Sequence, residues 1–366
     1  MSISFGESLE NKQIPKLQSP IKSLRGATKV VDAGADEIYC AVAIPELRKF
    51  SLYRGPRCAV STYDELGKIV NQAHDHGVEV IVAINEPFMG EIMEKSVQEH
   101  ISSCIEKEID AIIVGDLGVL NLIKDNNTDI PLYASTYFAT MNDSAIEFLR
   151  KQGFSRVILE RQLTIQELYD LTQHSKVDVE IFLGGAGCSN INVDCYLFHA
   201  EFPAMNQAFL TIDGFKFPCA MPFEIYEVDD KNKLVDKLPI LDAYTFCSIC
   251  LLPELMKIGV TGFKIEGRCL NDEYHEATTK LYRELIDIAT INDAKNFYDR
   301  VEFLKKSFKP LPGNMPLPNL EELSCEQKRC HYSGLFSAPY KQPMSWQTWT
   351  KHQFKYIEIP RGQTRE

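Results

Sequence analysis

One stretch of the chain gathers residues that suit metal chemistry. Five of the eleven cysteines lie between positions 185 and 251, and the first of them follows a glycine-rich run, Gly184-Gly-Ala-Gly-Cys188, with Cys195 seven positions on. Glycines let the backbone approach a bulky group closely, and thiolates bind soft metals, including the iron of iron–sulfur clusters. Two other interpretations stay open from spacing alone: thiols packed as small apolar groups, and a zinc site that uses Cys247 and Cys250.

A second group of candidates is charged. The run Lys264-Ile-Glu-Gly-Arg268 follows a short apolar segment. Its Glu266 could act as a general acid or base, and its Arg268 could clamp a carboxylate with a planar fork of donors. Arg161 follows another apolar segment and is a second candidate clamp, while a structural Glu–Arg ion pair is the alternative for both sites. We assign catalysis to Glu266 and Arg268, and substrate binding to Arg161 and Lys264.

Three further polar residues are predicted to face the same site. Asn85 and Asp116 come at the ends of two apolar segments, so Asn85 is a substrate-binding candidate and Asp116 a catalytic one. Asp116 also stands where a helix N-cap belongs. Arg57 closes a loop of four cations that begins at Arg48 and is assigned to substrate binding, because a positive patch on an acidic chain would steer an anion. An ordinary solvated loop is the alternative.

The elements that would position these residues alternate between short apolar segments, typical of buried strands, and amphipathic helical segments. Eight such units indicate a (β/α)₈ TIM-like barrel, whose active site lies at the carboxyl ends of the strands. No G-x-G-x-x-G follows the first strand, which disfavours a doubly wound sheet. The predicted strands are 16–19, 36–40, 79–84, 111–115, 132–135, 156–159, 179–184 and 262–265. The predicted helices are 21–33, 62–76, 92–107, 118–124, 144–152, 164–174, 253–257 and 272–289.

The predicted barrel occupies residues 1–292 and carries a long insertion after its seventh strand, at 185–251. A loop of this length is unusual in a βα unit. It would emerge on the catalytic face and bring its cysteines there. Residues 293–366 are predicted to form a linker, proline-rich at 309–319, and a small C-terminal extension.

Composition narrows the classes of partner. The chain has 39 Lys+Arg and 51 Asp+Glu, a formal net charge of −12. Nucleic-acid binders usually carry a basic footprint, so the charge favours a small molecule or peptide over nucleic acid. No apolar run could cross a bilayer, and the first 17 residues have no apolar signal-peptide core, so we expect a cytoplasmic protein with no membrane partner. In the cytoplasm we expect the cysteines to be reduced thiols rather than a disulfide framework.

Several short motifs resemble the U-32, collagenase-like peptidase family. Its signature is E-x-F, glycine, a small residue, cysteine and a second cysteine seven positions on. The segment from Glu180 to Cys195 matches it, with departures at Gly187, Val193 and Phe198. The resemblance spans roughly residues 14–290. Further matches, in the same order as in the family, are Gly34–Tyr39, Asp116–Gly118, Ser135-Thr136 with Asn142, Arg161–Thr164 and Lys264–Arg268.

The resemblance implies an iron–sulfur hydroxylase. Family members of known activity hold a 4Fe–4S cluster and hydroxylate ubiquinone precursors or tRNA and rRNA bases without O₂, some with prephenate as oxygen donor. The chain would thus act on a small aromatic metabolite or peptide. The alternatives are hydroxylation of a tRNA or rRNA base, peptidase activity, and a role as the non-catalytic subunit of a heterodimer. No H-E-x-x-H or G-x-S-x-G motif supports a peptidase. The chain could pair with a copy of itself or with a related subunit. The implied cluster ligands are Cys188, Cys195, Cys219 and Cys247, with Cys40 as an alternative.

Overall fold

A computed structural model gives the structure of the chain. It describes residues 13–44, 58–85, 91–126, 128–185, 191–194, 222–226, 233–239, 246–268, 270–291, 293–307 and 332. Among these residues no helix is long and apolar enough to cross a membrane.

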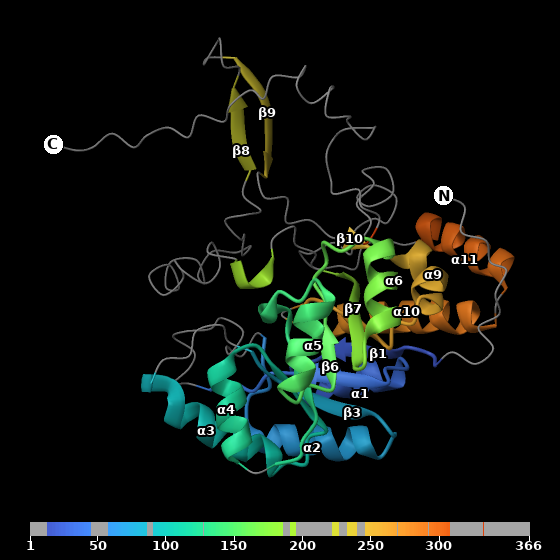
Figure 1. Cartoon of the computed structure of the whole chain (residues 1–366). Coiled ribbons are helices and arrows are strands. Elements are labelled where there is room, and N and C mark those ends of the chain that lie inside the picture. The colour runs from blue at the N-terminus through green and yellow to red at the C-terminus, as the bar shows by residue number, and fades with distance from the viewer. Residues whose placement is uncertain are drawn as a thin grey trace.

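Eight parallel strands close into a barrel, which confirms the predicted (β/α)₈ fold (Figure 1). Each strand from β1 to β7 pairs with the next, β7 pairs with β11, and β11 pairs with β1 to complete the ring. Every predicted strand is present, with small differences at the ends. The strands are β1 (Lys16–Pro20), β2 (Glu37–Cys40), β3 (Glu79–Ile84), β4 (Ala111–Val114), β5 (Leu132–Ala134), β6 (Arg156–Ile158), β7 (Asp178–Gly185) and β11 (Gly262–Ile265).

A helix follows each strand and lies outside the ring (Figure 1). Local chemistry sets where these helices begin and end. The Asn142 side chain accepts from the Ala145 N–H at the start of α5, Thr164 and Glu167 form a capping box on α6, and Gly153, just past α5, has φ +99°. The helices are α1 (Leu24–Asp32), α2 (Tyr63–His74), α3 (Glu91–Ile105), α4 (Leu117–Asp125), α5 (Asp143–Lys151), α6 (Ile165–His174), α9 (Leu252–Lys257) and α10 (Asp272–Thr290).

The strands bury two separate sets of side chains, because successive residues of a strand point to opposite faces of a sheet. One set packs against the surrounding helices and forms the larger apolar core. The other set fills the inside of the barrel. It includes an apolar cluster of Tyr39, Ile81, Ala83, Ala111, Ile113, Tyr133, Ile158 and Phe182.

The segments that interrupt or follow the barrel are described in part. Within the insertion, β8 (Pro222–Tyr226) and β9 (Leu234–Pro239) form an antiparallel hairpin, and β10 (Phe246–Cys247) pairs antiparallel with the end of β7. After α10, a helix that the sequence analysis did not predict, α11 (Ala294–Ser307), buries Phe297 and Val301 in the larger core. Tyr332 is buried there as well.

Candidate active site

The carboxyl end of the barrel carries a layer of polar side chains on its inner side. Strand alternation predicts this layer, since Glu160 continues the inward series of Arg156 and Ile158 in β6, and Glu266 continues that of Lys264 in β11. Glu160 is fully buried and Glu266 is 5% exposed. Two carboxyl groups therefore lie where a barrel enzyme places its chemistry.

Arg161 joins the two carboxyl groups. Its Nε donates to Glu266 Oε1 at 2.7 Å, its Nη2 donates to the same oxygen, and its Nη1 lies 3.9 Å from Glu160 Oε2. The guanidinium also stacks on the Phe182 ring, 4.3 Å from the centroid. The structure thus brings the predicted residues Arg161 and Glu266 into one buried ion pair, as the structural alternative anticipated.

The Glu160 carboxyl was not singled out from the sequence. Its Oε1 accepts from the Asn192 backbone N–H at 3.2 Å, but no hydrogen-bond donor of the described residues reaches its Oε2 or the Oε2 of Glu266. Burial, opposed by Arg161, raises the pKa of Glu160 to about 7, and the nearby charge of Glu266 adds to that rise. Burial also raises the pKa of Glu266, against the attraction of Arg161. Glu160 is therefore suited to exchange a proton near neutral pH, and Glu266 holds its proton more tightly than an exposed carboxyl does.

Amides and hydroxyls complete the layer. Asn85 Nδ2 donates to Ser135 Oγ at 3.2 Å, so the structure brings this predicted residue to the same end of the barrel. Asn192, from the start of the insertion, donates through its Nδ2 to Thr136 Oγ1 at 2.5 Å and accepts at its Oδ1 from Arg161. The insertion therefore contributes a side chain to the site that the sequence did not identify.

Asp116 is used as a helix cap. Its Oδ1 accepts from the backbone N–H groups of Gly118 and Val119, at 2.7 and 3.1 Å, at the start of α4. These contacts correspond to the capping alternative.

Lys264 lies one layer deeper than Glu266, inside the barrel. It is 5% exposed, and its Nζ lies 3.2 Å from Glu180 Oε1 and 3.6 Å from the centroid of the Tyr39 ring. Burial lowers the pKa of Lys264, against the attraction of Glu180. The side chain that was predicted to bind substrate is thus held by a glutamate.

The same deeper layer contains a second buried ion pair. Arg156 donates from Nη1 and Nη2 to the two carboxylate oxygens of Glu37, at 2.6 and 2.8 Å, and from Nη1 to Glu180 Oε2 at 2.9 Å. Burial opposes ionisation of Glu37, but the hydrogen bonds and charge of Arg156 prevail and lower its pKa to about 2. This layer is a charge-paired interior, a stabilising role distinct from that of the layer above.

Of the remaining predicted site residues, the structure describes Arg268 and the backbone of Cys247. Arg57, Cys188, Cys195 and Cys219 lie outside the described residues. Arg268 is half-buried after β11, and the backbone of Cys247 in β10 pairs with Gly184. Within the described part of the chain no group of three or more His, Cys, Asp or Glu could hold a metal ion.

The other described cysteines have varied surroundings. Cys40 is fully buried in β2, and Cys104 Sγ lies 3.5 Å from His100 Nδ1. Cys58 is disulfide-bonded, which the expectation of reduced thiols did not include.

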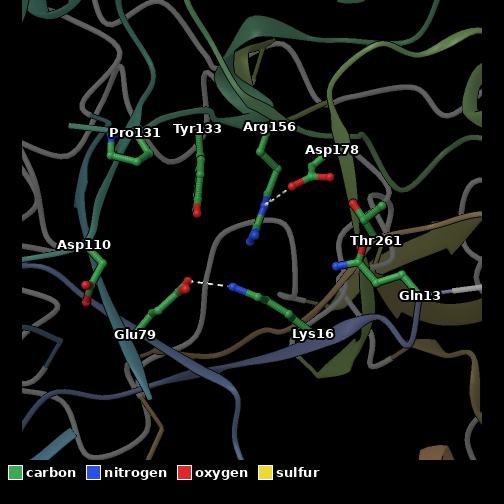
Figure 2. Close-up of a pocket in the computed structure, with 9 residues that line it drawn as sticks. All are labelled: Gln13, Lys16, Glu79, Asp110, Pro131, Tyr133, Arg156, Asp178 and Thr261. Carbon is green, nitrogen blue, oxygen red and sulfur yellow. Dashed lines mark hydrogen bonds and ion pairs between the residues drawn. The ribbon is translucent and has the colours of Figure 1, made fainter. Parts of the chain in front are cut away.

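A polar cavity of about 320 Å³ lies at the opposite, amino end of the strands (Figure 2). Ion pairs cross it: Lys16 Nζ lies 2.8 Å from Glu79 Oε2, and Arg156 Nε lies 4.0 Å from Asp178 Oδ2. None of the site residues predicted from the sequence lines this cavity. The amino face of such barrels serves stability, so we place the active site at the other end.

Comparison with known proteins gives consistent results. The family model for peptidase family U32 matches residues 22–310. An uncharacterized protease of Methanocaldococcus jannaschii is 30% identical over 80% of this chain and 69% of its own length. The 23S rRNA 5-hydroxycytidine C2501 synthase of Escherichia coli is 26% identical over 74% of this chain, which spans only 39% of that protein. The tRNA hydroxylation protein P2 of Bacillus subtilis is 26% identical over 63% of this chain and 74% of its own.

Among solved structures, the U32 peptidase Mk0906 covers 72% of this chain and 96% of its own, with a TM-score of 0.45 and 14% identity. The family model matches well over half of the chain, in agreement with the motifs at Glu180–Cys195 and Lys264–Arg268. The chain belongs to peptidase family U32.

Proposed function

We propose that this protein is an iron–sulfur enzyme that hydroxylates a base of RNA. The observation that carries the proposal is the naming of its relatives: an rRNA 5-hydroxycytidine synthase and several tRNA hydroxylation proteins match most of the barrel. The buried Glu160–Arg161–Glu266 cluster at the carboxyl end of the strands supports an enzyme rather than a passive scaffold, because carboxyl groups with raised pKa concentrate at active sites.

The proposed cluster ligands are Cys188, Cys195, Cys219 and Cys247. The described backbone fits this proposal at one point: β10 places Cys247 opposite Gly184, four residues before Cys188 in the chain. The backbone of Cys247 therefore lies beside the strand end from which the chain continues toward Cys188, and cysteine thiolates are the usual ligands of iron–sulfur clusters. When bound, a cluster supplies electron transfer or an iron that binds a substrate oxygen.

The roles of the chain's own residues follow from their contacts. Glu160 and Glu266 each have a raised pKa, so either can take the proton that leaves a ring carbon when C–H becomes C–OH. Arg161 orients both carboxyl groups, and Asn85 is placed to contact the substrate. The ring carbon gains a C–O bond and loses its proton and two electrons, while the donor loses a C–O bond and takes up those two electrons and a proton. We propose prephenate as the donor, with Arg268, half-buried just after β11, as a cation for its carboxylates, because the planar guanidinium suits a carboxylate.

Net charge favours a second candidate, a small aromatic metabolite or peptide as the substrate. The chain carries −12 overall, and RNA binding requires a positive surface along the phosphate backbone. Net charge does not show where the charges lie on the surface. We therefore rank RNA first as the substrate, on the names of the relatives. Peptidase activity and a non-catalytic role in a heterodimer are the remaining alternatives; Bacillus subtilis has relatives named P1 and P2.

Nucleoside analysis tests the proposal. Protein purified and reconstituted without O₂ is incubated with total RNA and prephenate, and the digested nucleosides are compared by mass spectrometry with those from a Glu266→Gln control. We expect one nucleoside to gain the mass of a single oxygen atom only with the unaltered enzyme. Unchanged RNA, with hydroxylation of an added aromatic acid or cleavage of a peptide instead, would move the corresponding alternative to first place.

A further inference from the structure

The carboxyl end of β7 is held by hydrogen bonds from distant parts of the chain. Between β7 and β11 the register shifts, so that Leu183 has no partner in the strand pairing. Its carbonyl instead accepts from the Ser248 N–H at 3.0 Å and from the Tyr282 hydroxyl at 3.0 Å. The next carbonyl, that of Gly184, accepts from the Glu266 N–H at 3.2 Å. The end of β7 is therefore fixed from several sides.

Tyr332 holds the carbonyl of Phe182, the residue before Leu183 in β7. Its hydroxyl donates to the carbonyl of Phe182 at 2.7 Å, and its own carbonyl accepts from the Ile165 N–H, at the start of α6, at 2.8 Å. The residue is 2% exposed and has φ +61°. A tyrosine adopts this left-handed backbone only where its surroundings hold it. Tyr332 thus bridges the end of β7 and the start of α6 through two ordered hydrogen bonds.

The phenol of Tyr332 also lies close to the charged site. Burial raises its pKa, and the charges of Glu266, Arg161 and Glu160 all act on it. Phe182, whose carbonyl it holds, carries the ring on which Arg161 stacks. Tyr332 stands beyond residue 310, where the match to the family model ends. A residue outside the family-matched part of the chain is therefore built against the site.

We propose that Tyr332 is a positioning residue of the active site: it holds the carboxyl end of β7, so that Phe182 supports Arg161 and the strand end from which the chain continues toward Cys188 is fixed in position. The support of Arg161 follows from described contacts alone. The effect on Cys188 rests on the proposed iron–sulfur function. Residues after the barrel would then be required for the site, rather than being an independent appendage.

Hydrogen exchange in the metal-free protein tests the first part. Tyr332→Phe removes only the hydroxyl, so the packing of the ring is kept. A hydrogen bond of ordinary net strength corresponds to about a five-fold change in a local opening equilibrium. We expect amides of 178–185 and 262–267 to exchange about five-fold faster in this variant, with β3 and β4 unchanged and the Tm lowered by at most about 3 °C. Tyr169→Phe, at an exposed position on α6, is the matched control. Equal exchange in the variant and the unaltered protein would overturn the proposal.

Iron release tests the second part. In reconstituted protein, Tyr332→Phe should lose iron to a chelator several-fold faster than the unaltered protein or Tyr169→Phe, at the same initial iron content. An unchanged release rate would overturn the link to Cys188. If the unaltered protein takes up no iron, the proposed cluster fails, and hydrogen exchange still decides whether Tyr332 positions β7.

Discussion

Replacing Glu160 with glutamine should stabilise the protein at alkaline pH. The carboxyl is fully buried, and its pKa in the folded protein is raised from 4.5 to about 7. A carboxyl with a higher pKa in the folded state holds its proton more tightly there, so the folded state loses stability as the pH rises from about 4.5 to about 7 and remains less stable above. At 1.36 kcal/mol per pKa unit, ionisation of Glu160 costs about 3 kcal/mol at pH 8.

Glutamine removes this cost and keeps the shape of the side chain. Its oxygen can still accept from the Asn192 N–H, and the interaction that it loses is the 3.9 Å approach to Arg161. The gain should depend on pH, since near pH 5 the carboxyl of the folded protein is already neutral. We expect Glu160→Gln to be more stable than the unaltered protein at pH 8, by a margin about 2.5 kcal/mol larger than at pH 5.

Urea unfolding at pH 5, 6.5 and 8 measures this difference, with the slope of the transition checked for constancy. Glu94→Gln, at an exposed position on α3, is the control and should change stability little at any pH. A Glu160→Gln variant that is less stable at every pH, or whose margin does not grow with pH, would refute the reasoning. Glu160 would then be an ionised structural group.

Three other substitutions test the rest of the site. Glu37→Gln should lower the free energy of unfolding at pH 7, measured with urea, by about 3 kcal/mol, because the pKa of Glu37 in the folded protein is lowered to about 2. The ionised carboxylate stabilises the folded protein above about pH 4.5, and this stabilisation is lost as the pH falls toward 2. The stability of the variant should therefore not show that loss. Cys188→Ala should lower the iron content of anaerobically reconstituted protein, whereas Cys104→Ala should not, and equal iron in both would remove Cys188 from the ligand set. Arg268→Lys keeps the charge but loses the planar fork, so prephenate should bind about tenfold more weakly by calorimetry with iron content unchanged; an unaltered affinity would return Arg268 to a structural role.

The barrel could be predicted because its signals are local and repeated. Each strand is a short apolar run, and glycines such as Gly153 end a helix before the next strand begins. The alternation of side chains within strands could have predicted more of the site than it was used for. Lys264 and Glu266 point to the same side of β11, so both face inward, with Lys264 one layer deeper and within reach of Glu180. The same alternation places Glu160 beside Glu266, although only its neighbour Arg161 was singled out from the sequence.

Other parts of the site have no local signal. Tyr332 lies 150 residues after Phe182, and no motif around it marks it as a site residue, so only the folded structure shows that the two residues meet. Asn192 lies inside a long insertion whose path strand periodicity does not determine. The helix α11 was missed because the change of composition after α10 was interpreted as a linker, whereas Phe297 and Val301, four residues apart, lie on one helical face and pack into the core.

The two charged layers inside the barrel differ in a way that separates stability from function. In the deeper layer both carboxylate oxygens of Glu37 accept hydrogen bonds from Arg156, and the pKa of Glu37 is lowered. Glu180 Oε1 lacks a hydrogen bond among the described residues, but it lies 3.2 Å from the Lys264 ammonium, so that carboxylate too has its own cation. In the upper layer Glu160 and Glu266 share one guanidinium, each keeps an oxygen that no described donor reaches, and both pKa values are raised. Buried carboxyl groups that are left without donors are retained at a cost to the fold. We therefore expect the upper layer, at the carboxyl end of the barrel, to be where that cost serves the proposed proton transfer and substrate binding.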